Sequence, residues 1–351
     1  MGNVARTRLR GGPSLLALLA ATVVALGACS SGSRSPSAGS SPPTGQPSPT
    51  TSAPTSSAPT SGDTPVVEDT GIKVTGAFNT NPTVAFPAGQ APKQLIEQTI
   101  VAGSGTPIAS GDTVITNYVG EIWPAKAGSQ AKVFDSSFSR GAPAGFVIGT
   151  GAVIPGFDKT LVGKRLGTRV VLSIPPADGY GPSGNSQAGI SGTDTLVFVV
   201  DLLTDYTPNA SAPGTADSEL PATGWPKITS IPAQEPHVTS VAGVNAPTAP
   251  TSKLLVKGSG AKIDPSKTLV LQLVGTDIPT GTQTQSSWGK QPDLVSAQNL
   301  LSVASALSGQ NIGARAIVLL PATPAQPATA SAAAVPAAPA QILIIDVVGQ
   351  Y

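Results

Sequence analysis

The chain has 351 residues, which is enough for two ordinary domains with tails. Its 20 Lys and Arg residues nearly balance its 19 Asp and Glu residues, so it lacks the basic excess of a nucleic-acid-binding protein. The single cysteine excludes an internal disulfide, and no Cys/His/acid cluster in the sequence indicates a metal site. We therefore expect no nucleic-acid partner, no metal and no cofactor.

The N-terminal segment predicts export. Three arginines within the first ten residues precede an apolar run over residues 14–28, which is the pattern of a secretion signal. The run ends in Leu26-Gly27-Ala28-Cys29. This ending resembles the bacterial lipobox, which implies cleavage after residues 1–28 and lipidation of the Cys29 sulfur. Two acyl chains give stable anchoring, so we expect the extracytoplasmic face of the cell membrane. The alternative is an ordinary signal peptide beside a chance cysteine.

Residues 29–66 are rich in Ser, Pro, Thr and Gly. Such a composition cannot bury a core, and it predicts a flexible tether.

Residues 67–206 show the alternation of a sheet domain. In chain order the sequence predicts strands at 71–75, 82–87, 95–101, 113–120, 169–174 and 196–203. The strand at 113–120 is expected to end in Gly120, and the strand at 196–203, apolar on both faces, is expected to be central. Residues 155–163 predict one short helix, with proline in its first turn and glycine after its end. The pattern favours an α+β fold with an antiparallel sheet.

The chain then repeats itself after a Pro/Ala/Ser-rich linker at 207–225. Thr113–Gly120 matches Thr268–Gly275, and four further blocks recur in the same order within 226–351. The same fold is therefore expected twice.

The second copy lacks the aromatic and acidic side chains of the first. Counterparts assigned from the sequence are Leu273 for Tyr118, Thr284 for Phe134, Gln285 for Asp135, Val303 for Phe157 and Ile345 for Phe198. We expect this copy to be catalytically silent and to serve as a spacer, a dimer contact or a client platform.

Residues 132–157 are the most informative stretch. Apolar and aromatic residues alternate there with turn residues, and the carboxylate of Asp135 lies next to Phe134. An aromatic pocket with one polar group is one interpretation. The other is that each residue, taken singly, is ordinary core or a turn cap.

The order of motifs over residues 107–203 resembles the FKBP-type peptidyl-prolyl isomerases, the macrolide-binding immunophilins. The motifs are a Tyr-x-Gly strand, Phe-Asp-Ser-Ser, Val-Ile-Pro-Gly-Phe, Gly-Tyr-Gly and a Leu-Val-Phe strand. The resemblance implies an antiparallel sheet wrapped around one short helix, with a pocket between them. It implies catalytic roles for Tyr118, Asp135, Tyr180 and Phe198. It implies substrate-binding roles for Phe134, Arg140, Phe146, Val153, Ile154, Phe157 and Ile190.

The residue types fit isomerisation of an Xaa-Pro bond. Rotation must overcome an amide barrier of about 18–20 kcal/mol, but no bond breaks and no proton leaves. A dry pocket that favours the twisted amide is therefore sufficient, without nucleophile, metal or cofactor. The Ile154 N–H and the Tyr180 hydroxyl are expected to hold flanking carbonyls, while Asp135 orients and stabilises the twisted carbonyl without acting as a base.

The expected partners are proline-containing polypeptides that are unfolded or partly folded, possible macrolide inhibitors, and the membrane through the lipid anchor. Two other functions stay open. The same pocket suits a non-catalytic proline-peptide-binding module or holdase chaperone, and the chain could also be a purely structural envelope protein.

Overall fold

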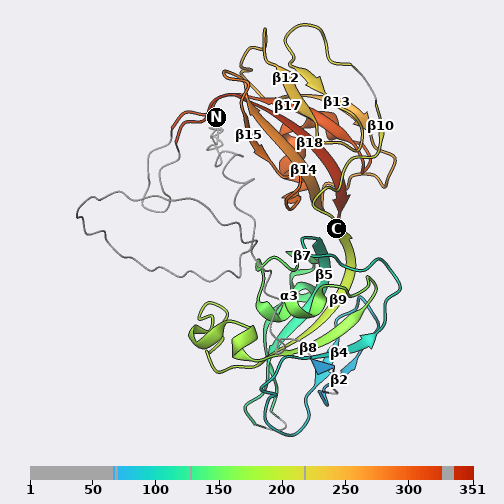
Figure 1. Ribbon diagram of the computed structural model, residues 1–351, viewed down its shortest axis with the longest axis vertical. Helices are drawn as coiled ribbons and strands as arrows, with labels where there is room; N and C mark the ends of the chain where they lie inside the picture. The colour runs from blue at the N-terminus through green and yellow to red at the C-terminus, as the bar shows by residue number, and fades with distance from the viewer. Residues whose placement is uncertain (1–65, 68–69, 127–128, 217–218, 326–335) are drawn as a thin grey trace, which may run out of the picture.

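The computed structural model describes residues 66–67, 70–126, 129–216, 219–325 and 336–351. The expected signal peptide, Cys29 and all of the expected tether except its last residue lie outside this range. No helix in these described segments is long and apolar enough to cross a membrane. Figure 1 shows two sheet units, a first unit (residues 66–206) and a second unit (residues 215–351), which meet near the C-terminus.

The first unit is built on a strongly curved sheet with the strand order β1-β4-β8-β9-β5-β6, and β7 also pairs with β5. All pairings are antiparallel except β1 with β4, which is parallel. The strands are β1 (Val66–Val67), β4 (Ile96–Val101), β5 (Thr113–Ile122), β6 (Lys132–Ser136), β7 (Ala144–Val147), β8 (Arg169–Ile174) and β9 (Leu196–Tyr206).

Most of the predicted elements of this unit are present. β9 lies between β8 and β5 and is buried along most of its length, as expected of a central strand. The predicted strand at 113–120 does not end at Gly120 but continues as β5 to Ile122, because Gly120 still pairs with β6 and β9. The predicted helix is α3 (Pro155–Leu161). A second helix of four residues, α2 (Ser137–Arg140), was not expected.

The concave face of this sheet packs on α3, and the convex face is covered by a hairpin. Phe157 and Leu161 of α3 are buried against the sheet. On the other face, β2 (Lys73–Thr75) and β3 (Thr83–Ala85) form a two-stranded ribbon whose Val74 and Val84 pack on a buried cluster around Trp123. The helices η1 (Pro176–Asp178) and η2 (Gly181–Ser183) lie in the loop between β8 and β9.

The second unit has a sheet of the corresponding order, β10-β13-β17-β18-β14-β15, with β16 on β14. Its elements are β10 (Thr215–Ala216), β11 (Lys227–Thr229), β12 (His237–Ser240), β13 (Thr251–Lys257), β14 (Thr268–Asp277), β15 (Gln283–Ser286), β16 (Asp293–Ser296), α4 (Ala297–Val303), η3 (Ser305–Leu307), β17 (Arg315–Leu320) and β18 (Gln341–Gln350). The β11–β12 hairpin covers its convex face, as β2–β3 does in the first unit.

Each hairpin is attached to its sheet by a buried arginine. Arg169 forms an ion pair with Asp201 at 2.6 Å, and its other N–H groups donate to two carbonyls of the β2–β3 turn. Arg315 forms an ion pair with Asp346 at 2.5 Å and donates to two carbonyls of the β11–β12 turn. Both guanidinium groups are fully buried. A buried charge is tolerated only when it is paired and hydrogen-bonded in this way, so each hairpin belongs to its unit.

One assigned counterpart is wrong by two positions. Gly120 pairs with Phe198 in the first sheet, whereas Gly275 pairs with Leu343 in the second. Leu343, and not Ile345, therefore occupies the position of Phe198. A shift of two residues keeps a strand side chain on the same face, so hydrophobic alternation could not distinguish the two.

The expected linker lies against the second unit. The Pro208 carbonyl accepts a hydrogen bond from Gln272 Nε2 at 2.8 Å, and the N–H of the buried Ala212 donates to Asp346 Oδ2 at 3.0 Å. Further along, β10 pairs with β13. The connection is therefore hydrogen-bonded to the second sheet.

Candidate functional site

An aromatic cluster lies on the concave face of the first sheet. Its five rings meet mostly edge to face, with centroid separations of 4.9 Å between Phe157 and Phe198 and 5.4 Å between Phe134 and Phe198. Tyr118 lies 5.5 Å from Phe146 and 6.1 Å from Phe198. Strands β5, β6, β7 and β9 and helix α3 each supply one ring, so the fold brings five of the six predicted aromatic residues together. The sixth, Tyr180, packs against the same core from the loop after β8. Such edge-to-face pairs stabilise each other beyond their burial.

Gly120 makes room for this cluster. A Cβ at this position would lie 2.7 Å from the Phe134 ring and 2.9 Å from the Phe198 ring. The residue was expected only to end a strand. Glycine is needed at position 120 because two phenyl rings pack directly against its backbone, in the space that a side chain would take.

The carboxylate of Asp135 is held at the edge of the cluster by two donors. The Tyr118 hydroxyl donates to Asp135 Oδ2, and Arg140 forms an ion pair with Oδ1. Arg140 also donates to the Tyr118 hydroxyl oxygen at 2.9 Å. Burial, and then the hydrogen bond to Asp135, raise the pKa of Tyr118 above its ordinary range, so this hydroxyl remains a donor at neutral pH.

A hydrogen-bonded chain behind this group went unnoticed in the sequence. The Tyr118 N–H donates to Ser137 Oγ, which donates to Asn117 Oδ1, both at 2.8 Å. Asn117 Nδ2 then donates to Asn79 Oδ1 at 2.7 Å, and the Asn79 N–H donates to Asp201 Oδ2 at 2.8 Å. The chain links the wall that carries Tyr118 to the turn of the β2–β3 hairpin.

The residues before α3 line the rim of the site. Ile154 is the N-terminal cap residue of the helix and is buried, and Val153 is half-buried against the same core. Asp158 holds the preceding loop, because its carboxylate accepts the N–H groups of Gly149 and Gly151, both at 2.6 Å. Asp158 was not among the predicted site residues. Its position three residues after the proline of α3 is the usual place for such an acceptor near a helix start.

Tyr180 and Ile190 come from the long loop between β8 and β9. Ile190 is buried in the core of the site, and Lys132 Nζ donates to the Gly189 carbonyl at 3.0 Å, which ties this loop to β6. The Tyr180 hydroxyl oxygen is buried, and its geometry satisfies no hydrogen bond with the described residues. Burial raises the pKa of Tyr180, although nearby Asn185 lowers it in part. A buried hydroxyl without an acceptor costs about 1–3 kcal/mol.

Among the residues that the structure describes, the equivalent face of the second unit carries no aromatic cluster. The space above Gly275 is filled by the Gln285 side chain, which a Cβ there would meet at 2.6 Å. Gly275 pairs with Gln285 as Gly120 pairs with Asp135, so the register agrees with the predicted counterpart.

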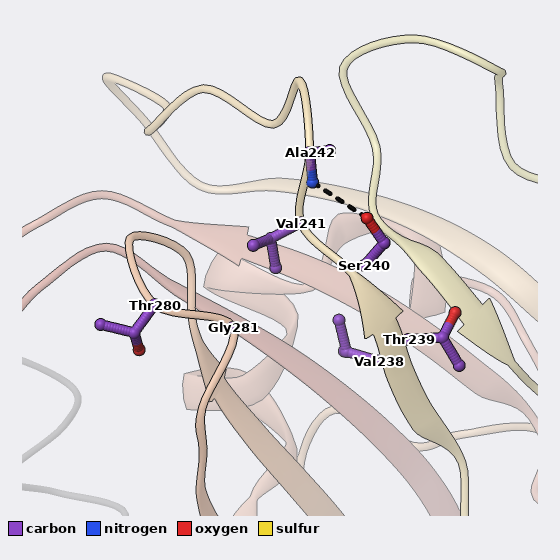
Figure 2. A pocket seen from close by; sticks show the side chains of 7 residues that line it. All are labelled: Val238, Thr239, Ser240, Val241, Ala242, Thr280 and Gly281. Carbon is purple, nitrogen blue, oxygen red and sulfur yellow. Dashed lines mark hydrogen bonds between the residues drawn. The ribbon is translucent and has the colours of Figure 1, made fainter.

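A hollow of about 440 Å³ lies on the second unit between β12 and the turn after β14 (Figure 2). It is lined by Val238, Thr239, Ser240, Val241, Ala242, Thr280 and Gly281. No ionisable side chain lines it, and the residues of the aromatic cluster all belong to the other unit. We assign the chemistry to the aromatic cluster rather than to this hollow.

The segment that carries the aromatic cluster is also the part of the chain that resembles known proteins. The family profile of FKBP-type peptidyl-prolyl cis-trans isomerases matches residues 105–203. The chain is 38% identical over 122 residues to an FK506-binding protein of Streptomyces anulatus, and the aligned stretch covers 94% of that protein and 35% of this chain. It is 35% identical over 122 residues to a probable FK506-binding protein of Corynebacterium glutamicum, covering 96% of that protein and 35% of this chain. It is 36% identical over 126 residues to the FKBP-type isomerase FkpA of Escherichia coli, covering 43% of that protein and 36% of this chain.

Proposed function

Because the chain belongs to the FKBP-type peptidyl-prolyl cis-trans isomerases, a family of enzymes, we propose that its first unit isomerises Xaa-Pro bonds of extracytoplasmic polypeptides. The family binds proline-containing peptides and macrolides, and both classes suit an aromatic site. The observation that carries the proposal is the cluster of five rings with one carboxylate at its edge, where Tyr118 and Arg140 hold Asp135.

The mechanism requires differential binding of a twisted amide. The rings of Phe134, Phe157 and Phe198 exclude water from the bound proline, and a less polar environment favours the twisted amide, which has lost its resonance. Asp135 cannot rotate freely, because Tyr118 and Arg140 each hold one of its oxygens. The negative charge of Asp135 acts electrostatically on the carbonyl of the twisting amide, and no proton is transferred.

Tyr180 supplies the polar contact that the substrate completes. Its hydroxyl is buried and lacks an acceptor, so a substrate carbonyl would gain a full hydrogen bond there. We assign the Ile154 N–H to the other flanking carbonyl and Val153 and Phe146 to the walls.

The second unit is, in this proposal, a degenerate copy of the FKBP-like fold that is catalytically silent. Its matching strand order, its buried Arg315–Asp346 pair and its convex-face hairpin support common descent with the first unit. Gln285 and Leu343 in place of Asp135 and Phe198 support the loss of activity.

The proposed location is the extracytoplasmic face of the membrane, with residues 1–28 removed, Cys29 lipidated and residues 30–66 as a tether. The sequence pattern alone supports this part. Replacement of Cys29 by serine followed by membrane fractionation tests it, and a variant that still sediments with membranes would contradict lipid anchoring.

A protease-coupled assay on a short Xaa-Pro peptide tests the activity with the full chain. We expect Asp135→Gln and Phe198→Leu, which introduce the residues of the second unit, each to lower kcat/KM by about tenfold or more, equivalent to at least about 1.4 kcal/mol of transition-state binding. Val133→Ala, at an exposed position of β6, serves as the matched control. Equal rates for all four proteins would overturn the proposal. Peptide binding without any catalysis would favour the holdase alternative, and no binding at all would favour a structural envelope role.

A further inference from the structure

Two glycines within strands lie where the first and second units meet. Gly145 is in β7 and Gly349 is in β18, and neither has the positive φ that would require glycine. A strand glycine weakens a sheet unless another group approaches its backbone closely. We therefore expect another group to pack closely against the backbone of each glycine.

The other unit provides that neighbour in each case. A Cβ on Gly145 would lie 2.6 Å from Leu294 Cδ1 and 3.6 Å from the Tyr351 hydroxyl oxygen, both in the second unit. Its nearest neighbour in its own unit, Ile115 Cδ1, would lie at 3.2 Å, so the severe overlap is with Leu294. A Cβ on Gly349 would overlap the phenol ring of Tyr206, which ends β9 of the first unit. Burial raises the pKa of Tyr206 and raises that of Tyr351 to about 12, as expected of rings enclosed at an interface.

The residues involved occupy equivalent positions in the two units. Tyr206 pairs with Thr113 at the start of β5, and Tyr351 exchanges backbone hydrogen bonds with Thr268 at the start of β14. Gly145 pairs with Ile115, while Leu294 pairs with Val270, the counterpart of Ile115. The contacts thus follow an approximate two-fold relation, in which the same part of each unit faces the other. Ile115 and Val270 are both fully buried.

The contact lies on the opposite face of β7 from Phe146, one ring of the aromatic cluster. Successive side chains of a strand point to opposite faces. Phe146 packs with Val114 in the core that holds the aromatic cluster, so Gly145 points away from it, toward Leu294. A larger residue at position 145, or loss of the Leu294 contact, would therefore displace β7 and with it Phe146.

We propose that the second unit docks on the first through this pseudo-two-fold interface and supports β7, so that it positions Phe146 in the isomerase site. The docking is independent of the function proposed above, whereas the positioning of Phe146 rests on it. The partner that fits this surface is the second unit of the same chain.

A double-mutant cycle in the full chain tests the docking. Gly145→Ala in a strand ordinarily stabilises, but here we expect it to lower the midpoint of thermal unfolding by on the order of 2–5 °C, because the added methyl overlaps Leu294. Leu294→Ala is also expected to lower the midpoint, and the two together are expected to cost less than their sum. Leu301→Ala, in the core of the second unit, is the matched control and should add to Gly145→Ala. Additive effects with Leu294→Ala, or a higher midpoint for Gly145→Ala, would overturn the docking.

Isomerase kinetics on the same proteins test the support of Phe146. We expect Gly145→Ala to raise KM with little change in kcat, because Phe146 contacts the proline ring throughout the reaction, and we expect Leu294→Ala to restore KM in the double variant. A KM that does not respond while the unfolding midpoints remain coupled would overturn the positioning but keep the interface. A wild-type chain without isomerase activity would overturn the proposed function. The non-additive unfolding midpoints of the Gly145 and Leu294 variants would still test whether the two units dock.

Discussion

Tyr180 and Tyr118 show how two tyrosines of one site can differ in what they contribute to folding. The Tyr118 hydroxyl donates to Asp135 and accepts from Arg140, so folding has already used its hydrogen-bonding capacity. No described residue accepts a hydrogen bond from the buried Tyr180 hydroxyl. Folding therefore carries an energetic cost at Tyr180 that a substrate carbonyl accepting this hydrogen bond would remove.

Tyr180→Phe is expected to raise or leave unchanged the thermal unfolding midpoint while lowering kcat/KM. Removal of a buried hydroxyl that lacks an acceptor relieves a cost of about 1–3 kcal/mol, whereas a bound substrate loses its donor. Calorimetry and the peptide assay on the same protein check both halves. Tyr118→Phe is the contrasting variant, because it breaks two hydrogen bonds and should lower the midpoint. A Tyr180→Phe protein that is less stable than wild type would show that the hydroxyl has a structural partner.

The residues of the aromatic cluster could be predicted from the sequence because each lies in a short motif of fixed spacing. Phe134 and Asp135 are adjacent, and Phe157 follows Ile154 by one helical turn. Asn79 and Asn117 could not be predicted. They meet across 38 positions, and their contact depends on a turn whose backbone is left-handed at Asn79. A single asparagine in a polar stretch does not reveal such a turn.

The β2–β3 hairpin acts on the site through this asparagine. Asn79 has φ 62° and Ala233, in the turn of the β11–β12 hairpin, has φ 64°. Only Asn79 extends a side chain to the sheet, where its Oδ1 accepts from Asn117 Nδ2. Residues outside the matched family segment therefore support the wall that carries Tyr118.

Asn79→Gly is expected to lower kcat/KM several-fold with a loss of stability of only about 1 kcal/mol. Glycine keeps the left-handed turn and the backbone hydrogen bond to Asp201, so only the side-chain hydrogen bond is lost. Ala233→Gly is the matched control and should stabilise slightly without a change in rate, because it relieves a strained alanine. Equal rates for Asn79→Gly and wild type would mean that the hairpin only covers the sheet.

At the level of elements, alternation predicted six strands of the first unit but neither β6 nor β7, and it could not determine register. β14 and β18 keep hydrophobic residues on the same face after a slip of two, so Ile345 was assigned where Leu343 lies. The interface glycines gave no signal either. A glycine in a strand is equally compatible with a bulge, and only the folded chain shows which side chain lies above Gly145 or Gly349.

For the molecule as a whole, stability is expected to depend on pH through one enclosed carboxyl of the second unit. Asp293 of β16 is largely enclosed, and burial raises its pKa from 3.8 to about 6. The folded state therefore binds this proton more tightly than the unfolded state does. The neutral form stabilises the fold below about pH 4, and this contribution is lost as the pH rises from about 4 to about 6.

Asp293→Asn is expected to raise the unfolding midpoint at pH 7.5 and to change it less at pH 4, since asparagine removes the cost of burying a carboxylate. The full gain at neutral pH is at most about 3 kcal/mol. Scanning calorimetry of the full chain at both pH values checks this. Asp264→Asn should show the opposite sign, because hydrogen bonds from Ser266 lower the pKa of Asp264 and stabilise its charged form. A gain for Asp293→Asn that is equal at both pH values would contradict the burial of a charge.

The buried arginines set the smallest piece of this protein that can fold alone. The matched family segment begins at residue 105, yet Arg169 inside it finds two of its acceptors in the turn at residues 76–80. A gene fragment trimmed to the family boundaries would leave that guanidinium short of acceptors and would expose the apolar face around Trp123. The boundary of homology therefore lies inside the boundary of the folding unit, and expression of either unit alone would have to begin upstream of its hairpin.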